Sequence, residues 1–255
     1  MRWIALGALL ALPAFAAELK PKTVEAFDRY IRETEQRLDE SKTFLWADES
    51  PERAQRIKAG EVLVQPFHTK AVNPVPNGLV HDWVGSVFIP GVTLQQVLAL
   101  VQDYDHHKDI YKPEVIGSRT LSHNGNDFHI YLRLLKKKVI TVVLNSEHDV
   151  KYIPIDATRW RSISRSTKIA EVEDAGKPNE REKRPGEGEG FLWKLNSYWR
   201  FQERDGGTWV ECQAVSLTRN VPTGLGWIVE PIIRDLPKES LSNTLRATRT
   251  AALAR

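Results

Sequence analysis

The stretch DFHIYLRLLKKKVITVVLNSEHDV, residues 127–150, places three lysines between two runs in which apolar and polar residues alternate. Alternation with a period of two residues is typical of a β-strand that buries one face. If the three lysines form the turn, Leu135 pairs with Val139 and Arg133 pairs with Thr141. The stretch is therefore predicted to be a β-hairpin with one apolar face.

We expect the apolar face of this hairpin to lie inside the protein. It comprises Phe128, Ile130, Leu132, Leu134, Ile140, Val142 and Leu144, with Ser146 and His148 at its end. The opposite face carries His129, Tyr131, Arg133, Thr141, Val143, Asn145 and Glu147. Ordinary core packing explains any one of the apolar side chains, and only the whole fold can support a ligand cavity.

Further β-rich stretches lie on both sides of the hairpin and are separated by turn signals such as Asn124-Gly125 and Asp205-Gly206. Together they predict a six-strand antiparallel meander over residues 115–123, 127–135, 139–152, 158–172, 190–203 and 208–218. Residues 173–190 contain almost no apolar side chain, so we expect a mobile and dispensable surface loop there.

The meander is preceded by one more strand and followed by a helical pattern. Residues 79–89 suit a strand, and Thr93 can cap a short helix that carries Leu94, Val97, Leu98 and Val101 on one face. After residues 222–224 the apolar side chains return to helical spacing, which predicts a long C-terminal helix. They are Ile228, Ile232, Leu236, Leu241, Leu245 and Leu253.

The N-terminal quarter reads as a separate helical extension. Residues 23–45 have the apolar spacing of an amphipathic helix, and Ser50-Pro51 is a strong start for a second, short helix that Gly60 can end. Residues 73–78 should break regular structure and form the joint. We therefore expect an extension over residues 17–78 and a main domain over residues 79–255.

The first sixteen residues have the features of a removable signal peptide. An apolar run of about ten residues follows Arg2, too short for a membrane span of roughly twenty, and Ala14-Phe15-Ala16 is a small-x-small cleavage site. Cleavage predicts a periplasmic or secreted protein of bacterial origin. The remaining net charge of +2 gives little support to nucleic-acid binding, and the single cysteine, Cys212, excludes an intramolecular disulfide.

The order of strand, short helical pair, six-strand meander and long C-terminal helix resembles the START/Bet v 1-like superfamily, which includes START domains and polyketide cyclase/dehydratase-like proteins. The segment IPGVT at residues 89–93, leading to Val97, Leu100 and Asp103-Tyr104, and the segment PEV at residues 113–115 are also similar to that superfamily. The resemblance covers residues 79–253. It implies an α+β helix-grip fold, in which a curved antiparallel sheet wraps around the C-terminal helix.

The resemblance further implies a deep cavity between the sheet and that helix, used for hydrophobic small molecules. In the strand predicted over residues 190–203 one face is formed by alternation, as either a ligand wall or a core: it carries Phe191, Trp193, Leu195, Ser197, Trp199 and Phe201. The ligand-binding residues that we predict are Ile130, Leu132, Val142, Leu144, Trp193, Leu195, Ser197, Trp199, Trp227 and Ile228.

Candidate catalytic and metal-binding groups are few. Residues 105–109, DHHKD, are expected to be a solvated helix face because adjacent histidines point to different sides of a helix. Glu147, His148 and Asp149 alternate along a strand and cannot converge, although Glu147 can pair with Arg133 or His129. Residues 136–138 with Arg159, Arg161 and Arg165 are expected to be solvated strand ends, with transient membrane contact as the alternative.

Two functions remain open. The first is a non-enzymatic carrier of a hydrophobic molecule, with a lipid as the expected ligand, and the second is a cyclase/dehydratase-like enzyme that uses the same cavity. A carrier needs only apolar walls, whereas an enzyme needs an inward ionisable group with a perturbed pKa. A third reading, a pure interaction domain, requires a filled core. We predict no catalytic residue, no metal and no cofactor.

Overall fold

The computed structural model describes residues 18–68, 70, 72–137, 141–220 and 226–255, without the side chains of residues 226–235. Its helices are α1 (Pro21–Glu40), η1 (Trp46–Glu49), α2 (Pro51–Lys58), α3 (Leu94–Val101), η2 (Tyr104–His106), α4 (His107–Ile110) and α5 (Gly226–Leu253). Its strands are β1 (Leu63–Pro66), β2 (Val72–Val75), β3 (Gly78–Pro90), β4 (Val115–Asn124), β5 (Asp127–Lys137), β6 (Thr141–Pro154), β7 (Arg159–Glu173), β8 (Arg181–Glu182), β9 (Lys194–Arg204) and β10 (Gly207–Arg219). The predicted signal peptide lies outside the described residues.

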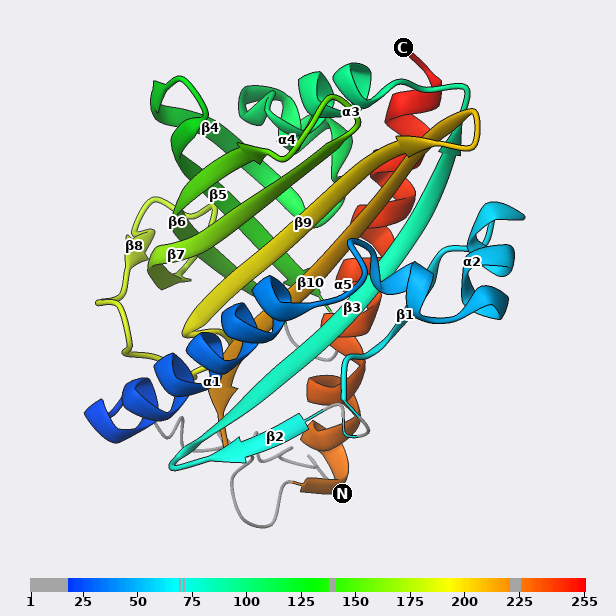
Figure 1. The fold of residues 1–255 in the computed structure, drawn as a ribbon. Coiled ribbons are helices and arrows are strands. Elements are labelled where there is room, and N and C mark those ends of the chain that lie inside the picture. The colour runs from blue at the N-terminus through cyan, green and yellow to red at the C-terminus, as the bar shows by residue number, and fades with distance from the viewer. Residues whose placement is uncertain (1–17, 69, 71, 138–140, 221–225) are drawn as a thin grey trace, which may run out of the picture.

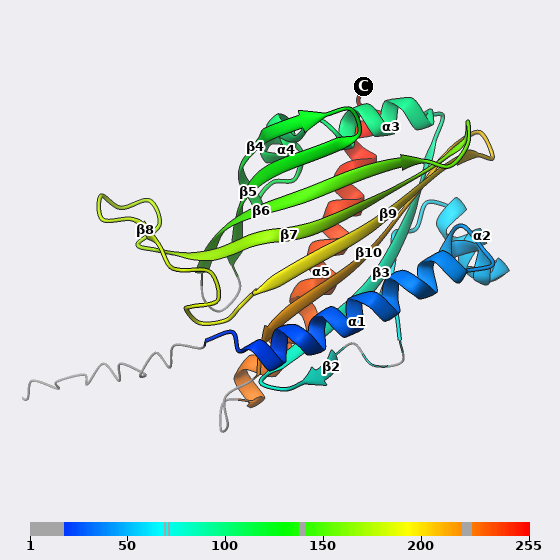
Figure 2. The same cartoon turned by 60° about the vertical axis from the view of Figure 1, so that its left-hand side comes forward.

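All of these strands belong to one antiparallel sheet with the order β1-β3-β10-β9-β7-β6-β5-β4, to which β2 and β8 add at β3 and β7. The meander closes back on the first strand of the main domain, because β10 pairs with β3 from Gly207–Pro90 to Arg219–Gly78. Helix α5 crosses one face of the sheet and α1 lies on the other (Figures 1 and 2). The predicted α+β helix-grip architecture is confirmed.

The register of the β5–β6 hairpin differs from the prediction, but the faces do not. Leu135 pairs with Val143 and Arg133 with Asn145, so β5 continues through Lys136 and Lys137, which were predicted to form the turn. Lys136 is held inside the ladder by an ion pair with Glu114. Each partner shifts by four residues, an even number, and therefore the described side chains of β5 and β6 stay on their predicted faces. Ile140, which was also predicted on the inner face, lies outside the described residues.

The face of the sheet that α5 covers is called the inner face here. Phe201, Val210 and Cys212 from the sheet pack in one cluster with Leu241 and Leu245 of α5. The backbone of β3 comes very close to α5 at Gly85, where an added Cβ would lie 2.7 Å from a Leu245 methyl. A side chain at this position would force Leu245 and the nearby Val64 methyl to shift, so glycine lets α5 and β1 pack closely on β3.

The short helices begin where their caps predict. The Thr93 hydroxyl accepts a hydrogen bond from the Gln96 N–H, and the Gln96 side-chain oxygen accepts one from the Thr93 N–H, which completes a capping box for α3. The Ser50 hydroxyl caps α2 by accepting a hydrogen bond from the Arg53 N–H. No helix in the described part of the chain is long and apolar enough to cross a membrane.

The N-terminal extension covers the opposite, outer face of the sheet. Phe27 and Ile31 of α1 pack on Val80, Val215 and Leu217, while a second cluster joins Leu45, Trp46 and Ile57 to Val84, Phe88 and Trp209. The extension is therefore part of the core and not an appendage.

Two details of the extension differ from the prediction. Helix α1 ends at Glu40, because Leu45 is drawn in extended conformation into the Trp209 cluster. Residues 73–78 do not break regular structure: Val72–Val75 forms β2, and a turn at Asn77 with φ of 57° leads directly into β3. Pro74 is tolerated because β2 lies at an edge of the sheet.

The charged segment at residues 173–190 is tied to the sheet by polar contacts. Arg133 binds Glu180 with two hydrogen bonds of 2.9 and 2.8 Å, and Lys168 forms an ion pair with Glu182 in β8. The buried Glu171 carboxylate accepts a hydrogen bond from the Glu189 N–H. The expectation that residues 173–190 are mobile was based on their lack of apolar side chains. These polar contacts hold the segment without apolar burial.

Candidate ligand-binding face

The middle of the inner face carries side chains that solvent still reaches. On β9, Leu195, Ser197 and Trp199 face α5, since Trp199 and Phe201 pack on the inner cluster and side chains alternate along a strand. Their neighbours in the ladder extend this region over β5, β7 and β10. The half-buried inward residues of this region include Leu132, Ser164, Leu195, Ser197, Trp199 and Ala214.

One end of this region is closed by a packed aromatic wall. Phe128 packs edge-on against Tyr104 and Tyr152, and the two tyrosine hydroxyls lie 2.9 Å apart. The Tyr152 hydroxyl also donates to the Val101 carbonyl at 3.1 Å. Burial raises the pKa of both phenols, so the wall stays neutral.

Several predicted ligand-binding residues lie on the inner face. Ile130 and Leu144 are buried, while Leu132, Val142 and Leu195 are half-buried around the cluster that contains Leu134 and Ile169. Ser197 and Trp199 lie beside them on β9. Trp227 and Ile228 fall in α5, but their side chains lie outside the described part of the structure.

Trp193 does not share a face with Trp199, and this part of the prediction is wrong. It packs on the outer side with Phe27 and Ile31 of α1, whereas Leu192 packs on the inner side. The alternation counted back from Phe201 holds only within β9, which begins at Lys194. Trp193 precedes that strand, and α1 supplies the apolar surface that buries its ring.

His148 is the ionisable group that faces inward from β6. It is buried, and its Nε2 lies 3.1 Å from the Ser146 hydroxyl. Burial lowers the pKa of His148 to about 4, so the ring is neutral at pH 7. Glu147 and Asp149 point to the other side and both contact His129, which confirms the predicted divergence and the predicted Glu147–His129 pair.

The DHHKD segment is solvated only in part. His106 is exposed and binds Asp103, but His107 is buried, with its Nε2 donating to the Val101 carbonyl at 3.1 Å. The ring of His107 packs between Tyr104 and Tyr111. The expectation of a wholly solvated face was therefore wrong for His107, because the chain turns from η2 into α4 at this residue.

Lys136 and the three arginines considered for membrane contact have acidic partners. Arg161 binds Asp39 and Arg165 binds Glu35, both at 2.6 Å, so these two arginines attach α1 to the outer face of β7. Arg159 binds Asp156 at 2.7 Å. These contacts give the arginines a structural use within the molecule.

The outer face also contains buried charges that sequence patterns did not single out. The Asp82 carboxylate accepts hydrogen bonds from the Tyr30 hydroxyl at 2.9 Å and the Gln213 amide at 2.6 Å, and Arg37 donates to Gln213 at 3.1 Å. Burial raises the pKa of Asp82, and these bonds partly oppose the rise. The only available signal was an acidic residue inside an otherwise apolar strand pattern.

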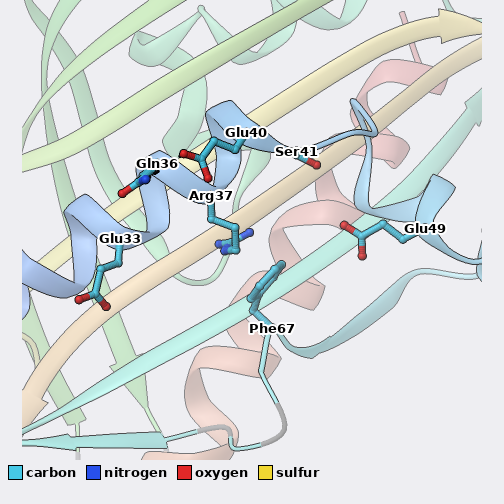
Figure 3. A pocket seen from close by; sticks show the side chains of 7 residues that line it. All are labelled: Glu33, Gln36, Arg37, Glu40, Ser41, Glu49 and Phe67. Atoms are coloured by element: carbon cyan, nitrogen blue, oxygen red, sulfur yellow. Dashed lines mark hydrogen bonds between the residues drawn. The ribbon is translucent and has the colours of Figure 1, made fainter.

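An open depression of about 380 Å³ lies above this network, between α1 and the loop that holds Phe67 (Figure 3). Its lining residues are Glu33, Gln36, Arg37, Glu40, Ser41, Glu49 and Phe67. The one aromatic ring is already covered, because the Arg37 guanidinium lies 3.6 Å from the Phe67 ring centre. This charged depression does not suit an apolar ligand.

No protein-family model and no curated protein matches this chain. Among solved structures, a STAR-related lipid transfer protein from Xanthomonas axonopodis is 15% identical, with 75% of this chain and 98% of that chain covered and a TM-score of 0.47. A START superfamily protein from Mycobacterium smegmatis is 12% identical; the match covers 68% of this chain and 98% of that chain, with a TM-score of 0.46. The Zhui aromatase/cyclase from a Streptomyces species is 14% identical; the match covers 69% of this chain and 95% of that chain, with a TM-score of 0.44.

The fold follows from the topology of the chain itself. Strand β3 is followed by the short helices α3 and α4, by the meander of β4, β5, β6, β7, β9 and β10, and by α5 on the inner face. The last meander strand pairs with β3, and the first, β4, ends the sheet. This is the arrangement of the START/Bet v 1-like, or helix-grip, fold.

Proposed function

We propose that this protein is an exported carrier of a hydrophobic small molecule, which binds between the inner face of the sheet and α5. The supporting observation is the half-buried patch at the middle of the inner face, around Leu195, Ser197 and Trp199. Outer-face residues of the same strand, Tyr198 and Arg200, are buried beneath the N-terminal extension. Solvent therefore reaches β9 from the α5 side, and this supports a ligand space between the sheet and α5.

A lipid is the ligand class that we favour. The patch combines leucine, tryptophan and small side chains, and the aromatic wall at Phe128 closes one end of it. Organic extraction of the purified protein, followed by mass spectrometry, tests the proposal. A stoichiometric apolar molecule is expected; an empty extract together with failure to bind any apolar probe would contradict it.

Trp199→Ala should cost less stability than Phe201→Ala. Both rings face α5 from β9 and stack at a centroid distance of 6.0 Å, but Phe201 is fully buried whereas Trp199 is half-buried. Truncating a packed aromatic costs about 3–5 kcal/mol. We expect that loss for Phe201→Ala and under about 2 kcal/mol for Trp199→Ala, because less packing is lost at a wall that faces a space.

Chemical denaturation measures the two losses, and binding of the neutral naphthalene ketone prodan measures the effect on the ligand space. Trp199→Ala should change prodan affinity severalfold. Equal stability losses for the two variants, with prodan affinity unchanged by Trp199→Ala, would make Trp199 an ordinary core residue.

Export is proposed from the sequence of residues 1–16, in which the apolar run ends at Ala14-Phe15-Ala16. Expression of the whole chain in a Gram-negative host should yield periplasmic protein whose first residue is Ala17. N-terminal sequencing makes the test, with a variant carrying Ala14→Glu and Ala16→Glu as the control that blocks cleavage. Material that still begins at Met1 would exclude a cleaved signal.

A cyclase/dehydratase-like enzyme is the second candidate, and His148 is the observation that favours it. Its neutral imidazole lies on the inner face, bound to Ser146, and its pKa of about 4 is far from the ordinary value. Perturbed ionisable groups on an inward face are typical of acid/base sites. Turnover of a co-purified ligand that His148→Gln abolishes without loss of binding would establish the enzyme.

A further inference from the structure

We propose that the ligand space recognises a neutral oxygen atom of its ligand, such as a ketone or ester carbonyl, through a polar row formed by Trp83, Ser197 and Ser164. This inference rests on the proposed function and narrows its ligand class. It selects apolar molecules that carry oxygen partway along their length, in preference to bare hydrocarbons and to free carboxylates.

The three side chains occupy one line across the sheet. Trp83 on β3 pairs with Ala214 on β10, Ala214 pairs with Ser197 on β9, and Ser197 pairs with Ser164 on β7. Residues that are directly opposite in an antiparallel ladder project from the same face. That face is the inner one, because Trp83 belongs to the α5-side cluster and Ser197 lies between Leu195 and Trp199.

The row contains a buried hydrogen-bond donor with no acceptor. Trp83 is 6% exposed, and its indole Nε1–H has no partner in the described part of the chain. An unmet buried donor costs about 1–3 kcal/mol and is uncommon in native proteins. A ligand acceptor supplied at this face would remove the cost.

The two serine hydroxyls of the row also have no side-chain hydrogen-bond partner among the described residues. Ser164 and Ser197 are both half-buried. Of the other inward serines, Ser166 accepts from the Leu195 N–H at 3.0 Å and Ser146 donates to the Leu132 carbonyl at 3.2 Å, whereas Ser162 and Ser216 are more deeply buried than the serines of the row. The row is therefore the place on the inner face where an unpartnered indole N–H and two half-buried hydroxyls lie in one line.

The chemistry of these groups limits the ligand. An indole N–H only donates, so its partner must be an acceptor such as a carbonyl, ether or hydroxyl oxygen. The row continues beyond Ser164 with Val150 and Phe128, which bring no positive charge. An ionised carboxylate would lose its hydration without gaining a cation, and a neutral oxygen avoids that cost.

The matched probes are prodan, which has a propionyl ketone, and its analogue with a propyl group in place of the propionyl. We expect wild-type protein to bind the ketone about tenfold more tightly than the analogue, the size of one well-placed hydrogen bond. Trp83→Phe, and separately Ser164→Ala with Ser197→Ala, should reduce this preference to about twofold or less. Emission of bound prodan should move to shorter wavelength in both variants as its carbonyl loses hydrogen bonds.

Trp193→Phe is the control, because Trp193 also has a buried Nε1–H without a partner but packs with α1 on the outer face. It should leave the ketone preference unchanged. Equal binding of the two probes by the wild type, or equal loss of preference in Trp193→Phe and Trp83→Phe, would overturn the polar row and leave the carrier proposal standing. Failure of the wild type to bind either probe would overturn both.

Discussion

Lowering the pH from 7 to 5 should remove about 2 kcal/mol of stability for each of three buried histidines, His81, His107 and His148. Burial lowers the pKa of each ring to about 4, against an ordinary value of 6.5. In the unfolded chain these histidines therefore become protonated below about pH 6.5, whereas in the folded chain they stay neutral until the pH is near 4. Stability from these histidines is present above pH 6.5 and is lost as the pH falls.

Each ring has a reason to resist charging. The Nε2 atom of His107 must donate to the Val101 carbonyl, and His81 and His148 have the hydroxyls of Thr218 and Ser146 as their hydrogen-bond partners among the described residues. No carboxylate makes a direct contact with them in the described part of the chain. A buried imidazolium would thus be left without a counter-charge, which is costly in an apolar interior.

Denaturant titrations at pH 7 and pH 5 measure the effect by comparison of His148→Gln with the wild type. The variant should lose about 2 kcal/mol less between the two pH values than the wild type does. His106→Gln is the exposed control, where the Asp103 hydrogen bond raises the pKa of His106 and its contribution falls instead as the pH rises. Parallel stability profiles for His148→Gln and the wild type would contradict the assignment.

The sequence predicted the inner face of β5 and β6 better than it predicted their pairing. The face on which a strand residue lies depends only on alternation along the strand. Phe128, Ile130 and Leu144 were therefore predicted correctly as inward, although the cross-strand partners differ from the predicted ones by four residues. The register depends on the length of the turn, and Lys136 extends the ladder because Glu114 neutralises it. That contact joins residues distant in sequence and leaves no local pattern.

The candidate site was predictable only where regular strand geometry holds. Leu195, Ser197 and Trp199 lie within β9 and face α5, but Trp193 lies one residue before the strand and follows the surface of α1. The N-terminal extension could not be placed from its own periodicity, because its partner surface on β3 and β10 exists only after the sheet has formed. The polar row likewise combines three strands that no sequence window contains.

Glu211→Ala should destabilise the protein by about 3–5 kcal/mol, the range for removing one member of a buried charged group. The Glu211 carboxylate is buried on β10 and accepts hydrogen bonds from the Trp46 N–H at 2.9 Å and the Ala47 N–H at 3.2 Å. Arg200 on β9 is its neighbouring positive charge and donates to the Phe44 and Leu38 carbonyls. Alanine would leave two buried N–H groups without acceptors and a buried guanidinium without its carboxylate.

Glu211→Gln separates hydrogen bonding from charge, because its single carbonyl oxygen can still accept one of the two N–H bonds. It should cost less than the alanine variant, about 1–2 kcal/mol at pH 7. Burial raises the pKa of Glu211 to about 7, above the ordinary value of 4.5, since desolvation outweighs Arg200 and the two N–H donors. Titration of Glu211 therefore adds stability below about pH 4.5 that is lost as the pH rises through 7, a trend opposite to that of the histidines.

Hydrogen exchange at the Trp46 and Ala47 amides measures how much the Glu211→Ala substitution loosens the structure around them. Both amides are held between the outer face and the N-terminal extension, so Glu211→Ala should speed their exchange more than exchange at Val210, which lies on the same strand and faces α5. If the alanine variant lost under about 1 kcal/mol and the two amides stayed protected, Glu211 would not be what holds the extension. In that case the apolar clusters around Trp46 and Phe27, with the ion pairs of Arg161 and Arg165, would be sufficient to hold it.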